Sequence, residues 1–430
     1  MKKALFVGLL LSTGISFAQE APTFQRCFSP EYIDYQEGKT PGFKAHVDEQ
    51  FTIAKSGVVS KTNETYTIPV VVHIVHKTPE QNIHDSVVYN QIMTLNEDFQ
   101  RKNADTVNLR SDFDFVVGGS NIEFRLATID PDGNPTTGIT RTSTTTESFM
   151  DLMGFFQGDM SAMEAVKSNN EGGIDPWDQS RYLNIWVCNM AVNGSPAILG
   201  YATPPTGMSN WPPGSTAGMS DGVVVQYQAF GSNNPNDLGF GFEVLGRTTT
   251  HEVGHYLGLR HIWADGDCTK EDGIDDTPNA TDKSTGCPTT ANTCVDNIGG
   301  IDLPDMAENY MDYSDESCQN SFTKGQVALM HGVLENQRYD LVYNNPASVN
   351  EERFTAALYP NPTDHLLNIE INNGQVENVV IFNSFGQEIQ SVKYSKSSLQ
   401  LDVSHLEKGV YLMKITDHSG ANVVKRFVKQ

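Results

Sequence analysis

The chain has 430 residues, of which 38% are hydrophobic, and this is enough apolar side chain to build the cores of two or three domains. Its 53 acidic residues outnumber its 29 basic residues, which gives a formal net charge of −24. This balance argues against a nucleic-acid-binding protein, which needs a basic surface, and against tight binding to anionic membranes.

The first 18 residues predict a secretory signal peptide. Two lysines follow the initiating methionine, an apolar run spans Ala4–Leu11, and small side chains stand at Ser16 and Ala18. This is the order of a basic start, a short apolar stretch and a small-residue cleavage site. No later stretch reaches the roughly 18 consecutive apolar residues of a membrane-spanning helix. We therefore expect an exported protein with no transmembrane segment in its mature form.

Residues 19–61 are polar and weakly patterned. They lie between the signal peptide and the first strong strand pattern, and we interpret them as a pro-segment. A disordered leader is the alternative, because chain termini are often disordered.

Residues 62–345 carry the patterns of an α/β domain. The run at 66–75 is rich in β-branched residues and predicts a buried strand. Further strands are predicted at 121–127, 182–188 and 223–227. Helices are predicted from Asp85 or Ser86 to Gln100, over 248–259, and from Thr323, which forms a capping box with Gln326, to about Arg338.

The pattern changes after residue 345. Residues 346–354 are interpreted as a linker, and residues 355–430 alternate short strands with turns and show no helical period. A small β-sandwich is the natural interpretation. Its strands are predicted at 366–371, 376–382, 399–403, 409–416 and 422–427.

The sequence HEVGHYLGLRH at 251–261 places three histidines at the spacing of a metal site. His251 and His255 are four residues apart, so their imidazoles lie on one face of a helix. His261 would lie about 15 Å from His251 along a straight helix, so the chain must turn back for it to bind the same ion. Gly258 is placed for that turn, because glycine tolerates the left-handed conformation that ends helices. Three neutral imidazoles with one open position are typical of catalytic Zn²⁺.

Glu252 directly follows the first of these histidines. A carboxylate there can take a proton from a zinc-activated water that attacks a carbonyl group. The alternative is that the histidines are surface residues of an amphipathic helix. That alternative explains neither the ligand spacing nor the glycine break, so we interpret 251–261 as the catalytic motif of a zinc hydrolase.

Half of the net charge lies in residues 265–318. This segment has fourteen acids and two bases, a net charge of −12 out of −24. It favours binding of a cation or of a positively charged substrate, with a solvated acidic loop as the alternative. Four of the six cysteines lie in the same segment. In an exported protein they predict two disulfides with three possible pairings, and their spacing does not match a Cys₄ zinc site.

The chain resembles the pappalysin-type metzincins, a family of zinc metalloproteases. The resemblance covers roughly residues 62–340, and it is carried by IPVVVH at 68–73, HEVGHYLGLRHIW at 251–263 and NYMDYSDESC at 309–318. The extended histidine motif followed by a methionine turn is the metzincin signature. The resemblance implies an α+β catalytic domain, with a twisted sheet and helices in its upper half and a loop-rich lower half.

The resemblance also implies roles for individual residues. Glu252 would be the general base, Met311 would pack beneath the three histidines, and Tyr313 would help to stabilise the oxyanion of the tetrahedral intermediate. Glu316, two residues before Cys318, would line the S1′ pocket. Its carboxylate implies cleavage before Arg, with Lys second, because a carboxylate can pair bidentately with a guanidinium group.

Further implications concern cross-links and ions. The resemblance implies disulfides between Cys268 and Cys294 and between Cys287 and Cys318. It also implies structural Ca²⁺ in the acidic loop, which supplies the oxygen ligands that calcium prefers. The expected calcium ligands are Asp272, Asp275 and Thr277.

Cys27 follows Arg26 in the expected pro-segment. Its thiolate could occupy the open zinc position and exclude water, which would keep the enzyme latent. The alternative is an incidental unpaired cysteine.

The C-terminal unit resembles the sorting domain of type IX secretion. The resemblance covers about residues 355–430 and is carried by LYPNP at 358–362 and GVY at 409–411. It implies an Ig-like sandwich that directs passage across an outer membrane by the type IX machinery and is then removed. A permanent binding module is the alternative, because a sandwich fold alone decides no function.

Together these patterns predict a secreted zinc endopeptidase that acts on proteins or peptides and is latent until its pro-segment is removed. The rival hypothesis from another class is a calcium-dependent surface adhesion protein that retains an inactive protease fold.

Overall fold

The structure is a computed structural model, and it describes residues 24–57, 65–206, 220–239, 241–343, 356–371, 375–418 and 422–430. The predicted signal peptide and the predicted linker at 346–354 lie outside these residues.

A mixed sheet forms the centre of the larger unit, with the strand order β3-β1-β5-β9-β8. Strand β1 (Tyr66–His76) pairs in parallel with β3 (Ile122–Leu126) and β4 (Ile139–Ser143) along one edge and with β5 (Leu183–Cys188) along the other. Strand β9 (Val223–Gln226) continues the parallel order, and β8 (Gly200–Ala202) is antiparallel to it at the margin. Strands β5 and β9 are fully buried, as their continuous apolar runs predict.

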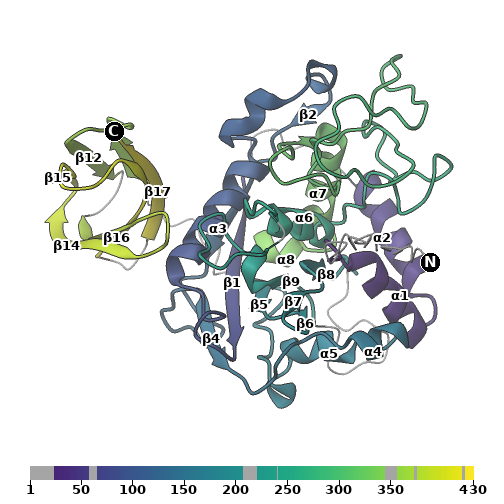
Figure 1. The fold of residues 1–430 in the computed structure, drawn as a ribbon, viewed down its shortest axis with the longest axis horizontal. Helices are drawn as coiled ribbons and strands as arrows, with labels where there is room; N and C mark the ends of the chain where they lie inside the picture. Colours follow the sequence, from purple (N-terminus) through teal and green to yellow (C-terminus); the bar gives the residue numbers. More distant parts are fainter. Residues whose placement is uncertain are drawn as a thin grey trace, which may run out of the picture.

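Two helices lie beside this sheet and position the site (Figure 1). Helix α3 (Asp85–Phe99) and helix α6 (Arg247–Tyr256) contact each other, and α6 also contacts β8 and β9. Both helices were predicted from the sequence to within a few residues. The N-cap of α3 is His84, whose ring accepts from the Ser86 N–H, rather than Asp85 or Ser86.

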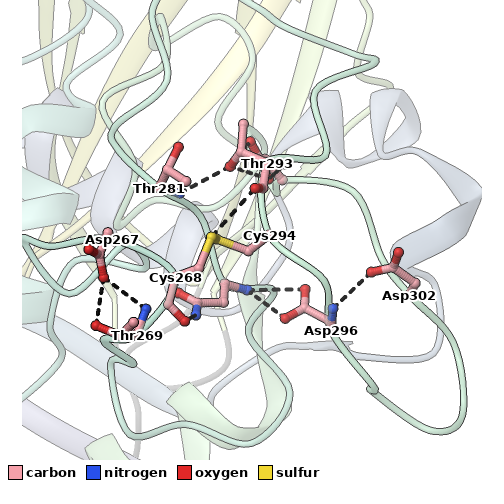
Figure 2. Close-up of a disulfide and its surroundings, with 10 residues drawn as sticks. Asp267, Cys268, Thr269, Thr281, Thr293, Cys294, Asp296 and Asp302 are labelled. Carbon is pink, nitrogen blue, oxygen red and sulfur yellow. Dashed lines mark hydrogen bonds between the residues drawn. A yellow bond between two sulfur atoms is a disulfide. The ribbon is translucent and has the colours of Figure 1, made fainter.

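The second half of this unit is rich in loops and ends in α7 (Lys324–Glu335). The capping box predicted at Thr323 and Gln326 is present. The disulfide pairings that the resemblance implied are those of the structure, Cys268–Cys294 and Cys287–Cys318. Figure 2 shows how the first disulfide is surrounded by short loops whose acidic side chains accept backbone N–H groups, as Asp296 and Asp267 do. Acidic side chains of this segment therefore stabilise the loops by accepting hydrogen bonds from their backbone N–H groups.

The remaining short elements of this unit connect these parts. They are β2 (Val117–Gly118), α4 (Leu152–Phe156), α5 (Ser161–Glu164), β6 (Ala191–Val192), β7 (Ser195–Pro196), β10 (Phe322–Thr323) and α8 (Tyr339–Val342).

The expected pro-segment is folded where it is described. Residues 24–57 contain α1 (Ser29–Lys39) and α2 (Phe43–Ser56), and α2 packs against α7. Sequence reasoning predicted no helix here, because the apolar residues of these helices are few and lack a clear period. The helices are stabilised by tertiary packing, with Tyr32 and Phe43 almost completely buried.

The C-terminal unit is a two-layer β-sandwich. One sheet has the order β11-β12-β15 and the other β14-β13-β16-β17. All neighbouring strands are antiparallel, and their inward side chains form a separate core. The predicted strands are present, and two more, β11 and β14, were not predicted. The strands are β11 (Ala356–Tyr359), β12 (Leu366–Ile371), β13 (Val376–Phe382), β14 (Glu388–Lys396), β15 (Ser398–Asp402), β16 (Gly409–Asp417) and β17 (Asn422–Lys429).

The sandwich rests on the outer side of α3 (Figure 1). Tyr89 of α3 forms a small apolar cluster with Phe382 and Leu412 of the sandwich. Lys414 Nζ donates to Tyr89 Oη at 2.6 Å, and Arg426 pairs with Glu97 at 3.2 Å. The contact lies on the far side of α3 from the histidine motif, so the sandwich leaves the site free.

Candidate active site

Helix α6 carries the histidine motif and is buried along its whole length. Gly246, at φ +81°, precedes it and offers no capping side chain. Instead Glu316, from a distant loop, accepts hydrogen bonds from the backbone N–H groups of Arg247 and Thr248. A carboxylate at this position both satisfies free N–H groups and complements the helix dipole.

The chain turns back after α6 as the motif predicts. Gly258 has φ +92°, and a Cβ atom there would lie 2.9 Å from a methyl group of Val333. Both facts favour glycine at this position. The turn returns His261 to the two helical histidines.

The three histidines converge. Their Nε2 atoms lie 3.1 to 3.2 Å from one another. The Nδ1 atom of His251 bonds to the Tyr310 carbonyl at 2.7 Å, that of His255 to the Leu259 carbonyl at 2.8 Å, and that of His261 to the Asp265 carboxylate at 2.7 Å. Each Nδ1 therefore donates, which leaves three Nε2 lone pairs directed at one point.

This arrangement fits a zinc ion. Zn–N bonds of about 2.0–2.1 Å in a tetrahedral site place ligand nitrogens about 3.3 Å apart, close to the spacing observed. Burial lowers the pKa of His255 to about 3 and that of His251 well below its ordinary value. Both rings are thus held neutral, as metal ligands must be.

Glu252 and Met311 are both fully buried at helix α6. Glu252 is fully buried beside the strand β8, so closely that a Cβ at Gly200 would lie 2.7 Å from its Cγ. Burial raises the pKa of Glu252 to about 8, against hydrogen bonds from Cys27 and Ser29. Met311 is also fully buried, and its sulfur would lie 2.5 Å from a Cβ at Gly254, on α6 itself. The close contact between Met311 and the helix requires a glycine there.

Tyr313 faces the histidines. Its ring centroid lies 4.9 Å from that of His261 and 5.7 Å from that of His251. Its hydroxyl donates to the Cys27 carbonyl at 3.0 Å. This phenol therefore lies beside the histidine cluster.

Cys27 completes the cluster. One ligand atom of Cys27 and of each of the three histidines lies within 4.8 Å of all the others. The thiol is fully buried and donates to Glu252 at 3.4 Å, and Ser29 Oγ donates to the same carboxylate oxygen at 3.0 Å. Burial, with the nearby Glu252, raises the pKa of this thiol.

The chain around Cys27 follows the margin of the sheet. The Gln25 N–H donates to the Ala197 carbonyl at 2.8 Å, and the Phe28 N–H donates to the Gly200 carbonyl at 3.0 Å. The Leu199 N–H donates back to the Gln25 carbonyl at 3.0 Å. Gln25 thus forms an isolated parallel bridge with Ile198, and Phe28 bonds to the first residue of β8, which holds Cys27 beside the histidines.

Arg26 lines a small pocket beside the cluster, together with His251 and Tyr313. Its Nη1 donates to the carbonyl oxygens of Tyr313 and Ser314, and its guanidinium lies 4.9 Å from the centre of the Phe242 ring. Burial lowers the pKa of Arg26, while the negative charges of Glu316 and Asp315 oppose that shift.

The structure gives Glu316 a different contact from the bidentate pair that we expected. Its side chain is 1% exposed, and its two oxygens accept from the N–H groups of Leu245, Arg247 and Thr248 and from the Thr248 hydroxyl. Its acceptor positions are therefore filled by the start of α6. Arg26 interacts with Glu316 through the attraction of their charges, and the two side chains form no bidentate pair.

The expected calcium ligands only partly come together. Asp272 is 3% exposed and accepts from the Thr277 hydroxyl at 2.8 Å, so these two residues are adjacent. Burial raises the pKa of Asp272 to about 7. Asp275 is turned instead toward Lys55 of α2, with 2.8 Å between its oxygen and Nζ. Calcium binding stays a prediction.

Sequence reasoning missed two residues that support the cluster. Asp265 orients His261, and it follows Ala264 in a turn where both residues have positive φ, 49° and 52°. Asp98 of α3 accepts from the Thr250 and Tyr310 hydroxyls beneath α6. An acid four residues after the last histidine was a signal for the first. The second depends on tertiary contacts and has no local signal.

Comparison with known proteins yields two family matches. The peptidase M43 family, described as pregnancy-associated plasma protein-A, matches residues 167–335. A family described as a secretion system C-terminal sorting domain matches residues 357–430.

Solved structures extend the first match. Mature mirolysin of Tannerella forsythia, in complex with a cleaved peptide, is 42% identical, with a TM-score of 0.56, and the match covers 65% of this chain and 97% of that one. A promirolysin variant of the same organism is 39% identical, with a TM-score of 0.61 and coverages of 74% and 96%. An extracellular metalloprotease of Verticillium alfalfae is 29% identical over 78% of this chain and 99% of its own length.

Proposed function

We propose a cleavage specificity for this chain, which belongs to the pappalysin family of metalloproteases and is a secreted metalloendopeptidase. It cleaves proteins before Arg, with Lys second, by zinc-dependent hydrolysis. We further propose that the intact chain is latent until its pro-segment is removed. The single observation that carries this proposal is the convergence of Cys27 with His251, His255 and His261, beside Glu252.

The three histidines would hold the zinc through Nε2, with Asp265 and two backbone carbonyls fixing their rings. A zinc ion there supplies Lewis acidity, which makes a water molecule nucleophilic and polarises the scissile carbonyl. Met311 would support this group from beneath, as its contact with α6 suggests.

Glu252 is the residue that we assign as general base. Once Cys27 and Ser29 leave, its Oε2 atom loses both hydrogen-bond donors and becomes available to the attacking water. Glu252 would accept the proton of that water and pass it to the leaving amine. Tyr313 would then donate to the oxyanion, since its hydroxyl already donates to a carbonyl group at this point, that of Cys27.

Latency follows from the same contacts. Cys27 would provide a fourth, sulfur ligand in the position that water needs. Its backbone carbonyl also accepts the hydrogen bond of the Tyr313 hydroxyl, so that this hydroxyl is engaged by the pro-segment. The backbone hydrogen bonds of Gln25 and Phe28 to residues 197–200 would also cover the edge at which an extended peptide binds.

The preference for Arg is supported by Arg26. A guanidinium group is already buried beside the cluster, close to the carboxylates of Glu316, Asp315 and Asp312. An Arg or Lys side chain of a substrate that entered this pocket would lie near the same three carboxylates.

We assign the chain regions accordingly. Residues 1–18 are the signal peptide, 19–61 the pro-segment, 62–345 the catalytic domain, 346–354 the linker and 355–430 the sorting domain that the type IX machinery recognises. Calcium bound near Asp272 and Thr277 would stabilise the loop-rich half. Among the described residues no helix has the length and apolar character needed to cross a membrane.

The test is digestion of a peptide library by the protein after its pro-segment has been removed. We expect cleavage before Arg and Lys, abolished by a zinc chelator and restored by zinc. A Glu252→Ala variant, the matched control, should retain bound zinc and lose cleavage. Unchanged cleavage by this variant would disprove the assignment of the base. A folded, zinc-loaded and processed protein that cuts nothing would favour an adhesion protein instead.

A further inference from the structure

Helix α1 of the pro-segment places Tyr32 among side chains of the catalytic unit. Tyr32 is fully buried, and its ring centroid lies 5.4 Å from that of Tyr201 in β8. The Nζ atom of Lys167, just after α5, lies 5.0 Å from the centroid of the Tyr32 ring. The Tyr32 hydroxyl donates to Glu164 Oε2 at 3.3 Å. We call the three surrounding residues, Glu164, Lys167 and Tyr201, the Tyr32 site.

The Tyr32 site is held in place by contacts within the catalytic unit. Lys167 Nζ donates to Glu164 Oε1 at 3.0 Å and to the Ser220 carbonyl at 3.2 Å. The Tyr201 hydroxyl donates to the Met163 carbonyl at 2.7 Å. These contacts do not involve the pro-segment, so the three side chains should keep their positions when the pro-segment is removed.

Removal of Tyr32 would leave two polar groups of the Tyr32 site with fewer partners. Lys167 is 3% exposed, and its Nζ atom also lies 4.8 Å from the ring centroid of Tyr201 and 5.8 Å from that of Trp186. A buried ammonium group is unfavourable unless opposite charges, hydrogen bonds or aromatic faces surround it. Without Tyr32, this ammonium loses one aromatic face and Glu164 Oε2 loses a hydroxyl donor. Another phenol ring would restore both contacts.

The path of the pro-segment relates the Tyr32 site to the scissile bond. Cys27 lies at the histidine cluster, and Arg26, on its N-terminal side, lines the small pocket beside the start of α6. On the C-terminal side of Cys27, Phe28 and Ser29 bond to β8, and Tyr32 follows them. If the substrate residue after the scissile bond occupies the pocket of Arg26, the residues before that bond therefore lie on the side of Tyr32.

We propose that the Tyr32 site is a subsite of the processed enzyme, and that it binds a tyrosine side chain of the substrate at a position before the scissile bond. The substrate ring packs against Tyr201 and faces Lys167 Nζ, and its hydroxyl donates to Glu164 Oε2. A phenylalanine keeps the first two contacts and lacks the third. This inference rests on the proposed cleavage before Arg, because the pocket of Arg26 gives the direction of the substrate.

The test uses peptides with Arg after the scissile bond and with Tyr, Phe or Ala at each of the four positions before it. A second set has Ala in place of Arg. The measured quantity is kcat/KM of the zinc-loaded protein after removal of its pro-segment. At one of the four positions we expect Tyr to exceed Ala about 10- to 100-fold and to exceed Phe about 3- to 10-fold.

Two variants separate the contacts of the ring from the contact of the hydroxyl. Lys167→Met removes the charge that faces the ring, so the ratio of kcat/KM for Tyr to that for Ala should fall about 3- to 10-fold. In Glu164→Gln the single oxygen stays with Lys167, and the amide nitrogen cannot accept the phenol proton. Its ratio of Tyr to Phe should fall to within about twofold of unity, with the ratio of Phe to Ala nearly unchanged.

Lys77→Met is the matched control, because Lys77 also pairs with a glutamate, Glu147, but does so at the surface of the catalytic unit. It should leave all of these ratios unchanged. The comparison of Tyr, Phe and Ala in the wild-type enzyme needs no variant, so it still decides the question if Lys167→Met does not fold.

The outcomes separate this inference from the proposed function. Cleavage before Arg with no preference for Tyr at any of the four positions overturns the inference and keeps the proposed preference for Arg. A preference for Tyr that is equally strong in the peptides without Arg supports the subsite, while equal cleavage of the two sets overturns the preference for Arg. A wild-type preference for Tyr that both variants retain in full would mean that another surface binds the ring, and this too would overturn the inference.

Discussion

The pro-segment and the C-terminal sandwich are both expected to leave the mature enzyme, yet they contact the catalytic unit in opposite ways. Residues 25–29 reach the histidine cluster, with Cys27 fully buried, Ser29 on Glu252 and Arg26 in the adjoining pocket. Among the described residues, the sandwich contacts the outer side of α3, mainly through the cluster of Tyr89, Phe382 and Leu412. The comparison teaches that one of these parts lies on the candidate catalytic residues, while the other is attached away from them.

The largest effect should come from Cys27→Ser. A serine hydroxyl is a far weaker zinc ligand than a thiolate, so the unprocessed chain should lose its latency. We expect at least a tenfold rise in the peptidase activity of the intact protein. Activity is measured on a fluorogenic peptide, with electrophoresis to show that the chain is still uncut.

Cys188→Ser is the matched control for that experiment, because Cys188 is the other free cysteine and is buried in β5. It should leave latency intact. If the two variants are equally latent, the pro-segment does not act through its thiol.

Asp265→Asn changes the hydrogen bond that orients His261, while the pro-segment and the sandwich both stay in place. The carboxylate that accepts from His261 Nδ1 is lost, and removal of such supporting groups typically weakens metal binding about 10- to 100-fold. The dissociation constant for zinc, measured by competition with a chromophoric chelator, should rise by that factor. Asp267→Asn, in the same loop but with its side chain bonded to Thr269 and not to a histidine, is the control and should leave the dissociation constant unchanged.

Glu316→Gln tests the start of α6, which the pro-segment approaches and the sandwich does not. A glutamine amide group would face backbone N–H donors with a donor of its own, so we expect a loss of about 1–3 kcal/mol in the free energy of unfolding. Urea denaturation measures it. A variant as stable as wild type would show that this carboxylate does not cap the helix.

The smallest effect should follow removal of residues 355–430. Because the contact on α3 lies away from the cluster, kcat/KM of the processed enzyme should change by less than about twofold. Exposure of Tyr89 should instead be seen in faster hydrogen exchange at the surface of α3. A large loss of kcat/KM would mean that the sandwich acts on the site through α3.

The sequence predicted the strands β1, β3, β5 and β9 and the helices α3, α6 and α7, because their apolar patterns and, for α7, the capping box are local signals. The zinc motif was equally readable, since His251, His255 and Gly258 lie within eight residues. The helices of the pro-segment were not predicted, because packing against the catalytic unit and not local pattern stabilises them. The saturated hydrogen bonding of Glu316 was not predictable either. It depends on a contact between residues about 70 positions apart in the sequence.

The most direct test of the account is zinc K-edge X-ray absorption of the intact, zinc-loaded chain. We predict one sulfur ligand at about 2.3 Å and three nitrogen ligands at about 2.0–2.1 Å, with the sulfur lost after the pro-segment is removed or in Cys27→Ser. A zinc ion with only nitrogen and oxygen ligands in the intact protein would contradict the assignment of Cys27 to the histidine cluster.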